Sequence, residues 1–509
     1  MDETTAKEKF INFLTRYGHF LWIAGLAFIF MTVCSTCSFM YPNNEWVDSN
    51  IYFTVGKAML KGKVLYRDIF DHKGFYIYAL HSVAYLISHR TFIGIYLVEI
   101  ALAFVFAYAE YRILLLYLEK KYALICLPFI MFASYSSFTL FHGDSAEELV
   151  MPFMAVSLWY LLEYAKGGKV SLIRYAAVGA FAAIAFWIKY TLCGFYLGWA
   201  VIMLIFELKD KTWKHLLAGI GAFFGAFLVV SLPVFIYFGV HGAFKDLWEV
   251  YFYDNLFVYS SGTRGNIVGF IKKIFWPLWV FIRSIYFGLS FYLLILPGFV
   301  YLIFTKDINR REKAAIFTTY GCMNFLIYAG GRGGVYYGFT VCMYAFIGMV
   351  ALCKLKFTSK ALDKVLKKFY VVAGICVFAL SGLSLAVNPI RYRVFSPTSS
   401  RVQYKFAKII EETHFSGNIL NYNALDLGIN TATDTVPECK YFFKPNIKLD
   451  EITDTQKEWV TEGKADYVVC IAPLPEAISE KYELLATARQ RSDTRIETYY
   501  LYALKEFTK

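Results

Sequence analysis

The chain has 509 residues, of which 58% are hydrophobic, 19% aromatic and only 18% charged. Its formal net charge is +12, but its lysines and arginines stand in short clusters between apolar runs, as in the cytoplasmic loops of membrane proteins. We therefore exclude a nucleic-acid partner and interpret the chain as a polytopic α-helical membrane protein embedded in a lipid bilayer.

Apolar runs of roughly twenty residues recur along the chain and predict about eleven transmembrane helices. The first run is long enough to remain as a span instead of being cleaved as a signal peptide. Residues 75–88 are too short to cross, and residues 269–283 are amphipathic, so both should lie along the membrane surface. The expected spans are residues 20–40, 92–116, 124–140, 149–164, 171–188, 192–206, 216–238, 285–304, 314–328, 335–352 and 370–387.

The basic clusters predict the topology. Clusters such as Lys120 with Lys121 and the run 354–368 all fall on one side if the spans alternate, which makes the N-terminus cytoplasmic and the C-terminus extracytoplasmic. The polar tail has no Asn-x-Ser/Thr acceptor sequence, which favours the cytoplasmic (inner) membrane of a bacterium.

From about residue 389 the sequence becomes polar, so we divide the chain there. Residues 1–388 form a membrane domain whose extracytoplasmic first loop is residues 41–90, and residues 389–509 form a small extracytoplasmic α/β domain. A disulfide between Cys439 and Cys470 is left open. Within the tail we expect strands at residues 418–422, 467–471 and 497–504, and helices around residues 453–461 and 475–488.

The polar stretch of residues 43–74 is the region around which we organise the function. It holds four carboxylates, a histidine and several lysines, where a membrane protein places chemistry and not a span. Asp48 opens a segment whose apolar residues share one helical face, so it either caps that helix or acts in catalysis. Capping does not account for the polar group that follows: Asp68, Asp71, His72 and Lys73.

A second acidic loop, HGDSAEEL at residues 142–149, falls on the same predicted face of the membrane. Ser145 and Glu148 have the spacing of a capping box, so a helix start explains part of the pattern. One helix start does not need four polar groups and a histidine. We divide Asp144 evenly between capping and catalysis and give Glu147 and Glu148 less weight as functional residues.

Cationic residues near these loops suggest a phosphate ligand. Lys189 closes a span, where it either snorkels to the surface or provides a counter-charge for a phosphate, a role that Lys73, Arg264 and Arg332 could share. Nucleotide donors are cytoplasmic, so a polyprenyl-phosphate sugar is the natural donor outside. A carboxylate would remove the proton of the acceptor hydroxyl while the cations stabilise the departing lipid phosphate.

Taken together, these features resemble the membrane-embedded glycosyltransferases of the GT-C fold, in particular the bacterial relatives of protein O-mannosyltransferases and aminoarabinose transferases. The segments that carry the resemblance are WVDSNIYF, KGKVLYRD, DHKGFYIY, HGDSAEE and FWIKYT. The resemblance implies Asp48 as the main catalytic carboxylate and Asp144 as the second acidic residue. It also implies that Lys73 and Lys189 contact the donor phosphate.

The chain departs from the family pattern at two places. Lys73 is followed by Gly74 where a proline is common, and Tyr336-Tyr337 stands where a His-Tyr pair is common. Such enzymes differ in metal use, so Mg²⁺ or Mn²⁺ is left open, with Asp48 and Asp144 as ligands if an ion is used.

We therefore expect a glycosyltransferase that moves a sugar from a polyprenyl-phosphate donor to a cell-envelope glycan, lipid or protein. One alternative is a transporter or flippase of lipid-linked glycans, which would place ionisable residues within its spans. The predicted spans are nearly free of such residues, and Glu99 and Glu110 are exceptions. Another alternative is an inactive scaffold whose tail binds partners. The expected substrate-binding residues are Asp68, Asp71, His72, Lys73, Glu147, Glu148, Lys189, Arg264 and Arg332.

Overall fold

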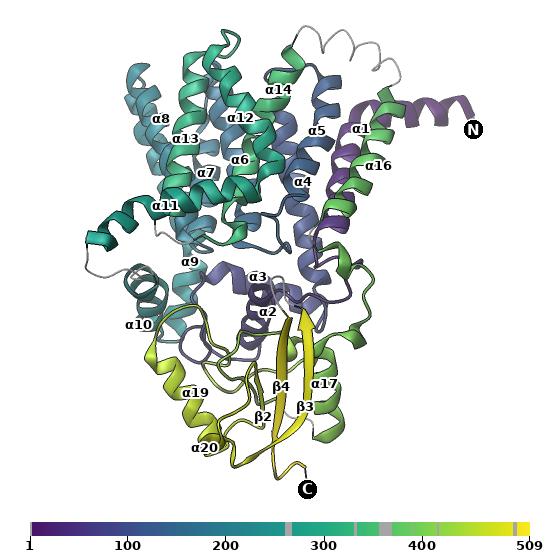
Figure 1. The fold of residues 1–509 in the computed structure, drawn as a ribbon. Coiled ribbons are helices and arrows are strands. Elements are labelled where there is room, and N and C mark those ends of the chain that lie inside the picture. The colour runs from purple at the N-terminus through teal and green to yellow at the C-terminus, as the bar shows by residue number, and fades with distance from the viewer. Residues whose placement is uncertain are drawn as a thin grey trace.

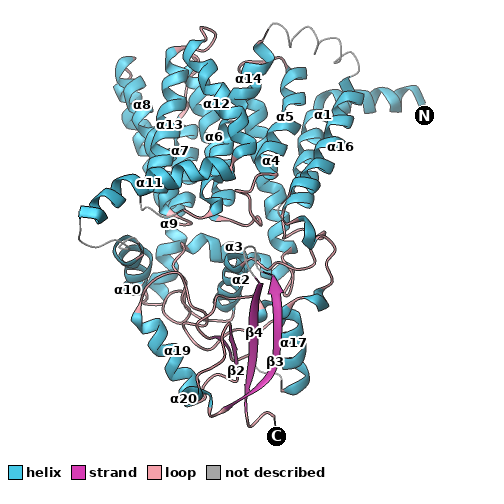
Figure 2. Ribbon diagram, viewed as in Figure 1, coloured by secondary structure: helices cyan, strands magenta, loops and turns pink. Residues whose placement is uncertain are grey.

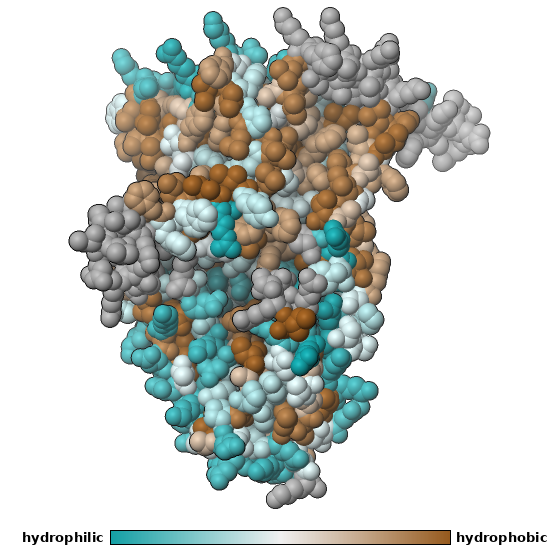
Figure 3. All heavy atoms as spheres, in the orientation of Figure 1, coloured by the Kyte–Doolittle hydropathy of each residue, from teal (hydrophilic) through white to brown (hydrophobic). Residues whose placement is uncertain are grey.

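The computed structural model describes residues 3–508 apart from residues 260–266, 330–332, 356–368, 389, 415–416 and 492–495. Long helices form one half of the molecule, and the strands all lie in the other half, with the C-terminus (Figures 1 and 2). On the face drawn in Figure 3, hydrophobic residues are concentrated on the helical half, and the other half is more hydrophilic. The helices of the first half are α1 (Glu3–Cys34), α4 (Ile93–Leu114), α5 (Lys120–Tyr135), α6 (Ala146–Ala165), α7 (Leu172–Phe186), α8 (Gly194–Lys209), α9 (Trp213–Val240), α11 (Ile267–Phe287), α12 (Leu289–Phe304), α13 (Arg310–Tyr328), η3 (Val335–Tyr344), α14 (Phe346–Lys354) and α16 (Phe369–Val387).

Within the described residues, five helical segments are long and apolar enough to cross a membrane by length and composition: Arg16–Cys34, Ile93–Leu114, Tyr190–Lys209, Trp213–Val240 and Val335–Lys354. This confirms a helical polytopic membrane protein with several apolar spans. The count of about eleven stays a prediction.

Two predicted surface segments are helices of the structure. Residues 269–283 lie within α11, which is bent by 107° from α12 and runs across the bundle (Figure 1). Residues 75–88 correspond to α3 (Phe75–Ile87), which packs against α2 (Val47–Leu60) between the two halves (Figure 1). The two helices approach closely because Gly56 has no side chain: a Cβ there would lie 2.8 Å from the carbonyl oxygen of Tyr78.

The C-terminal half contains a four-stranded mixed sheet of order β1-β2-β4-β3. In this sheet β1 and β2 are the parallel pair, and Ile419 lies opposite Tyr467 in their register. The predicted strands at residues 418–422, 467–471 and 497–504 are confirmed as β1 (Ile419–Asn421), β2 (Tyr467–Cys470) and β4 (Ile496–Leu504), and the helix near residues 453–461 as α19 (Asp450–Glu462).

The helix predicted at residues 475–488 is wrong. Only α20 (Glu476–Ser479) is helical there, and β3 (Tyr482–Arg491) follows it. The strand forms because it pairs along its length with β4, from Tyr482 opposite Leu504 to Arg491 opposite Ile496. This tertiary pairing outweighs the helix propensity of the Glu, Leu, Ala and Gln residues in the segment.

Shorter elements complete the two halves. They are η1 (Tyr190–Cys193), α10 (Phe244–Asp246), η2 (Leu247–Val258), η4 (Arg391–Arg393), η5 (Thr398–Ser400), α17 (Val402–Thr413) and α18 (Ile429–Ala432). The tail is joined to the first loop by backbone hydrogen bonds, one from Phe70 N to Lys440 O and one from Phe395 N to Met40 O. Both tail cysteines, Cys439 and Cys470, are free thiols.

Candidate active site

Asp48 lies in the first turn of α2 and does not cap it. The helix begins at Val47 with Trp46 as its N-cap residue, and no side chain there caps the backbone. The capping role considered for Asp48 is therefore wrong. Its Oδ2 atom instead accepts hydrogen bonds from the hydroxyls of Tyr336, at 2.9 Å, and Tyr52, at 3.3 Å. The positive end of the helix dipole also favours a carboxylate at this position.

Tyr52 connects the carboxylate to a cation. It stands one helical turn after Asp48, so both side chains share one face of α2. The ammonium of Lys73 lies over the Tyr52 ring, 5.9 Å from its centroid. Burial and the nearby Asp48 raise the pKa of the Tyr52 hydroxyl well above its usual value, so it remains a hydrogen-bond donor. Asp48 and Lys73 thus contact the same tyrosine.

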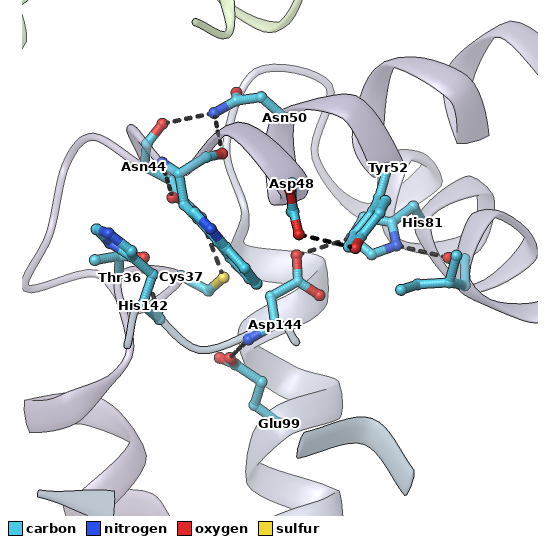
Figure 4. A network of polar contacts seen from close by, with 12 residues as sticks. Thr36, Cys37, Asn44, Asp48, Asn50, Tyr52, His81, Glu99, His142 and Asp144 are labelled. Carbon is cyan, nitrogen blue, oxygen red and sulfur yellow. Dashed lines mark hydrogen bonds and ion pairs between the residues drawn. The ribbon is translucent and has the colours of Figure 1, made fainter. Parts of the chain in front are cut away.

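Asp144 points toward the same region from the second acidic loop (Figure 4). It is fully buried, and its Oδ2 atom lies 2.9 Å from Nε2 of His81. Nδ1 of His81 lies 2.7 Å from the carbonyl oxygen of Ile77. Both ring nitrogens of His81 therefore lie beside oxygen acceptors, which fix the orientation of the imidazole next to Asp144.

The backbone of this loop is held by Glu99. Asp144 and Gly143 both adopt positive φ, 57° and 86°, a conformation that glycine takes at little cost. Oε1 of Glu99 accepts the N–H of Asp144 at 2.9 Å, and the Ser35 hydroxyl donates to the same carboxylate. Glu99, which stood out as a charge within a span, therefore orders the second acidic loop.

Lys189 is largely buried and is paired with a carboxylate. Its Nζ atom lies 2.5 Å from Oε1 of Glu147 and 3.5 Å from the ring centroid of Tyr337. Glu147 is fully buried, so Lys189 supplies its counter-charge. The neighbouring Glu148 N–H donates to the Ser145 hydroxyl at 3.1 Å, which confirms that Ser145 caps α6.

The two carboxylates before α3, Asp68 and Asp71, have different surroundings. Asp68 accepts the N–H of Val64 at 2.8 Å and pairs with Arg67 at 2.9 Å, which closes a partly exposed turn. Asp71 is buried and accepts the Tyr78 hydroxyl at 2.6 Å. Burial opposes its ionisation, but hydrogen bonding and the positive charge of Lys73 hold the pKa of Asp71 well below its usual range.

A pocket lies beside this group and is lined by both Lys73 and Lys189. We call it the two-lysine pocket. Burial acts to lower the pKa of Lys73, but Asp48 and Asp71 raise it above the usual value, so the ammonium stays charged. The opposite wall comes from η2 and η3, which are distant in the sequence. The lining residues are His72, Lys73, Ile188, Lys189, Tyr190, Thr191, Tyr251, Asn255, Tyr259, Ile327 and Tyr337.

Sequence reasoning missed the residues that hold Asp48 and Asp144. Tyr336 was noted only as a departure from a family pattern, and Tyr52 and His81 were not singled out. The spacing of Asp48 and Tyr52 on one helix could have indicated their contact. Arg264 and Arg332 lie outside the described residues. Within the described part of the chain, no group of three His, Cys, Asp or Glu side chains could hold a metal ion.

Comparison with known proteins identifies the fold. No family model matches the chain, and no curated protein sequence matches it significantly. Two solved structures of ArnT from Cupriavidus metallidurans, one bound to undecaprenyl phosphate and one in the apo state, match with TM-scores of 0.57 and 0.56 at 13% and 11% identity. Each match covers 94% of this chain and 97% of the ArnT chain.

A third structure matches over a similar part of the chain. The archaeal oligosaccharyltransferase AglB from Archaeoglobus fulgidus, in complex with an inhibitory peptide and a dolichol-phosphate, has a TM-score of 0.51 at 12% identity. The match covers 90% of this chain and 70% of AglB. The chain therefore has the GT-C fold of these membrane proteins, as the sequence motifs indicated.

Proposed function

We propose that the protein is a glycosyltransferase that moves a sugar from a polyprenyl-phosphate donor to a cell-envelope acceptor on the extracytoplasmic face of the membrane. The observation that carries the proposal is the position of Asp48. Its carboxylate is oriented by Tyr336 and Tyr52, and Tyr52 in turn contacts Lys73 of the two-lysine pocket. The solved structures of the same fold bound to undecaprenyl phosphate and dolichol-phosphate support a lipid phosphate as the ligand of that pocket.

In the proposed reaction Asp48 is the general base. It takes the proton of the acceptor hydroxyl as the acceptor oxygen forms a bond to the anomeric carbon of the donor sugar. The bond between that carbon and the phosphate oxygen breaks, and its electron pair leaves with the lipid phosphate. Lys73 and Lys189 stabilise the charge that develops there, so this leaving group needs little help from an acid.

The other polar residues have supporting roles in this scheme. Glu147 orients Lys189 through their ion pair, and the charge of Asp71 helps to raise the pKa of Lys73. Asp144 and His81 form a hydrogen-bonded pair close to Asp48 (Figure 4). Asp68 closes a turn and is expected to affect activity only through the loop that carries Lys73.

The proposal is tested by measuring release of polyprenyl phosphate from a panel of polyprenyl-phosphate sugars. Wild-type protein should release it from one donor of the panel, and Asp48→Asn should lower the rate at least about 100-fold, because general-base catalysis contributes that much. Glu483→Gln, at an exposed carboxylate of the sheet, is the matched control and should match the wild type.

Two results would contradict the proposal. Full activity of Asp48→Asn would remove this residue from the chemistry. Donor binding without release from any member of the panel would favour a transporter or an inactive scaffold.

A further inference from the structure

A second cavity, of about 490 Å³, lies between the first loop and the C-terminal sheet. It is distinct from the two-lysine pocket, because the two share no lining residue. Its size is that of a site for a ligand of several hundred daltons. The lining residues are Glu45, Trp46, Val47, Arg393, Asn423, Ala424, Leu425, Leu427, Lys444, Pro445, Asn446, Ile471, Gln490, Glu497 and Tyr499.

This cavity is adjacent to Asp48. Trp46 and Val47, which precede Asp48 directly, form part of its wall. The Trp46 ring also packs edge-on against the ring of Tyr336, with centroids 5.4 Å apart, and Tyr336 donates to Asp48. Asp48 therefore lies between the cavity and the two-lysine pocket, the position required of a base that acts on an acceptor while a donor occupies the other side.

The wall of the cavity is built from ordered groups. Oε1 of Glu45 lies 2.7 Å from Arg401, and Oε2 lies 3.4 Å from Arg393, with all three side chains almost buried. On the sheet, Glu497 and Tyr499 are two positions apart on β4, so they share one face. The Tyr499 hydroxyl donates to Glu497. Gln490 lies opposite Glu497 in the pairing of β3 with β4.

The chemistry of this lining favours a neutral, hydroxyl-rich ligand. Two carboxylates, Glu45 and Glu497, face two cations, Arg393 and Lys444, so the charges of the lining cancel and neither a polyanion nor a polycation is attracted. Amide side chains and a tyrosine supply both donors and acceptors. Aromatic faces offer flat apolar contact. A lipid chain would leave these polar groups unpaired.

We propose that this cavity binds the acceptor and that the acceptor is a neutral glycan. This inference rests on the proposed glycosyltransferase function, since it assigns the second substrate of the same reaction. The glycan hydroxyl to be modified would extend past Trp46 to Asp48, and the rest of the glycan would contact the sheet through Glu497, Tyr499 and Gln490.

The test is direct binding, which does not require turnover. Calorimetric titration of the full-length protein in nanodiscs would use neutral tetrasaccharides: β1,4-linked glucose, β1,4-linked N-acetylglucosamine and α1,6-linked mannose. We expect one of them to bind, and Glu497→Gln and Asn446→Ala each to weaken it about tenfold, as expected for loss of one hydrogen bond to the ligand. Glu483→Gln, on the same sheet outside the cavity, should bind as the wild type does.

The inference is overturned if no tetrasaccharide binds, or if the cavity variants bind as tightly as the wild type. It is also overturned if a serine-containing peptide or a phospholipid binds instead and that binding is lost in Glu497→Gln. These outcomes are separate from failure of the proposed function, which is seen as absence of polyprenyl phosphate release whatever the glycan does.

Discussion

At the scale of single residues, the candidate site is a set of charges held by partners from distant parts of the chain. Asp48 depends on Tyr336, which is 288 positions away in the sequence, and Asp144 on His81, which is 63 away. Asp144 is fully buried and Asp48 is partly buried, and carboxylates in such places are tolerated only when donors or cations compensate for the lost water. The partners therefore decide which of the acidic residues in the two loops remain available for chemistry.

A double variant separates two roles proposed for Lys189, which are pairing with Glu147 and contact with the donor phosphate. Lys189→Met alone should lower the stability of the protein by about 3 kcal/mol or more, because it leaves Glu147 charged and unpaired in a buried place. Glu147→Gln with Lys189→Met removes both charges and should restore the thermal unfolding midpoint. If Lys189 also contacts the donor phosphate, the double variant should keep a donor KM raised about tenfold. A donor KM equal to that of the wild type would limit Lys189 to neutralising Glu147.

At the scale of elements, the second acidic loop depends on a glycine at a tight approach. A Cβ on Gly143 would lie 2.4 Å from Oε1 of Glu99 and 2.6 Å from the Ser35 hydroxyl, and φ there is +86°. Gly143→Ala should therefore destabilise the protein by about 1–3 kcal/mol and displace Asp144. Gly62→Ala is the matched control, since φ is +94° but no atom lies within 4 Å.

The comparison of the two glycine variants isolates the clash from the backbone strain. For each variant, the thermal unfolding midpoint of the purified protein and its rate of polyprenyl phosphate release are measured. Equal losses in the two variants would mean that Glu99 and Ser35 move aside easily, and the loop would then not be ordered by Glu99.

The elements differ in how well the sequence predicts them. The apolar runs, α3 and the strands β1, β2 and β4 follow from local pattern because burial on one face or both sets their composition. The segment 475–488 was predicted as a helix, because only the pairing with β4 makes it a strand. The first acidic loop could be found from composition, whereas the contact of Asp48 with Tyr336 is a tertiary contact that no local pattern encodes.

At the scale of the whole molecule, α2 joins the two halves. Its first turn carries Asp48, and its last turn carries Lys57, whose side chain is fully buried against the C-terminal half. Nζ of Lys57 donates to the carbonyl oxygen of Asn430 at 2.7 Å and lies 3.6 Å from Asp434. The Thr54 hydroxyl, one turn earlier, contacts Asp426 at 3.3 Å.

This interface should respond to pH through Asp426. Burial raises its pKa to about 6, although the backbone of Gly428 and the Thr54 hydroxyl oppose this. Because the folded-state pKa lies above the unfolded value of 3.8, protonation stabilises the folded state below pH 3.8, and this contribution is lost as the pH rises through about 6. Relative to Asp426→Asn, the wild type should gain about 2 kcal/mol between pH 6 and pH 4. A pH-independent difference in unfolding midpoint between the two proteins would contradict this.

The position of Lys57 predicts that docking of the C-terminal half and catalysis are coupled. Lys57→Met keeps the length of the side chain but removes the hydrogen bond to Asn430 and the charge beside Asp434, so the C-terminal half should dock less firmly. We expect faster amide hydrogen exchange in α18 and at the C-terminal end of α2, and lower polyprenyl phosphate release because Asp48 belongs to the same helix. Lys464→Met is the matched control, since Lys464 pairs with Glu458 and Glu462 on an exposed surface, where ion pairs contribute little. Faster exchange with unchanged release would mean that α2 holds Asp48 in place without help from the C-terminal half.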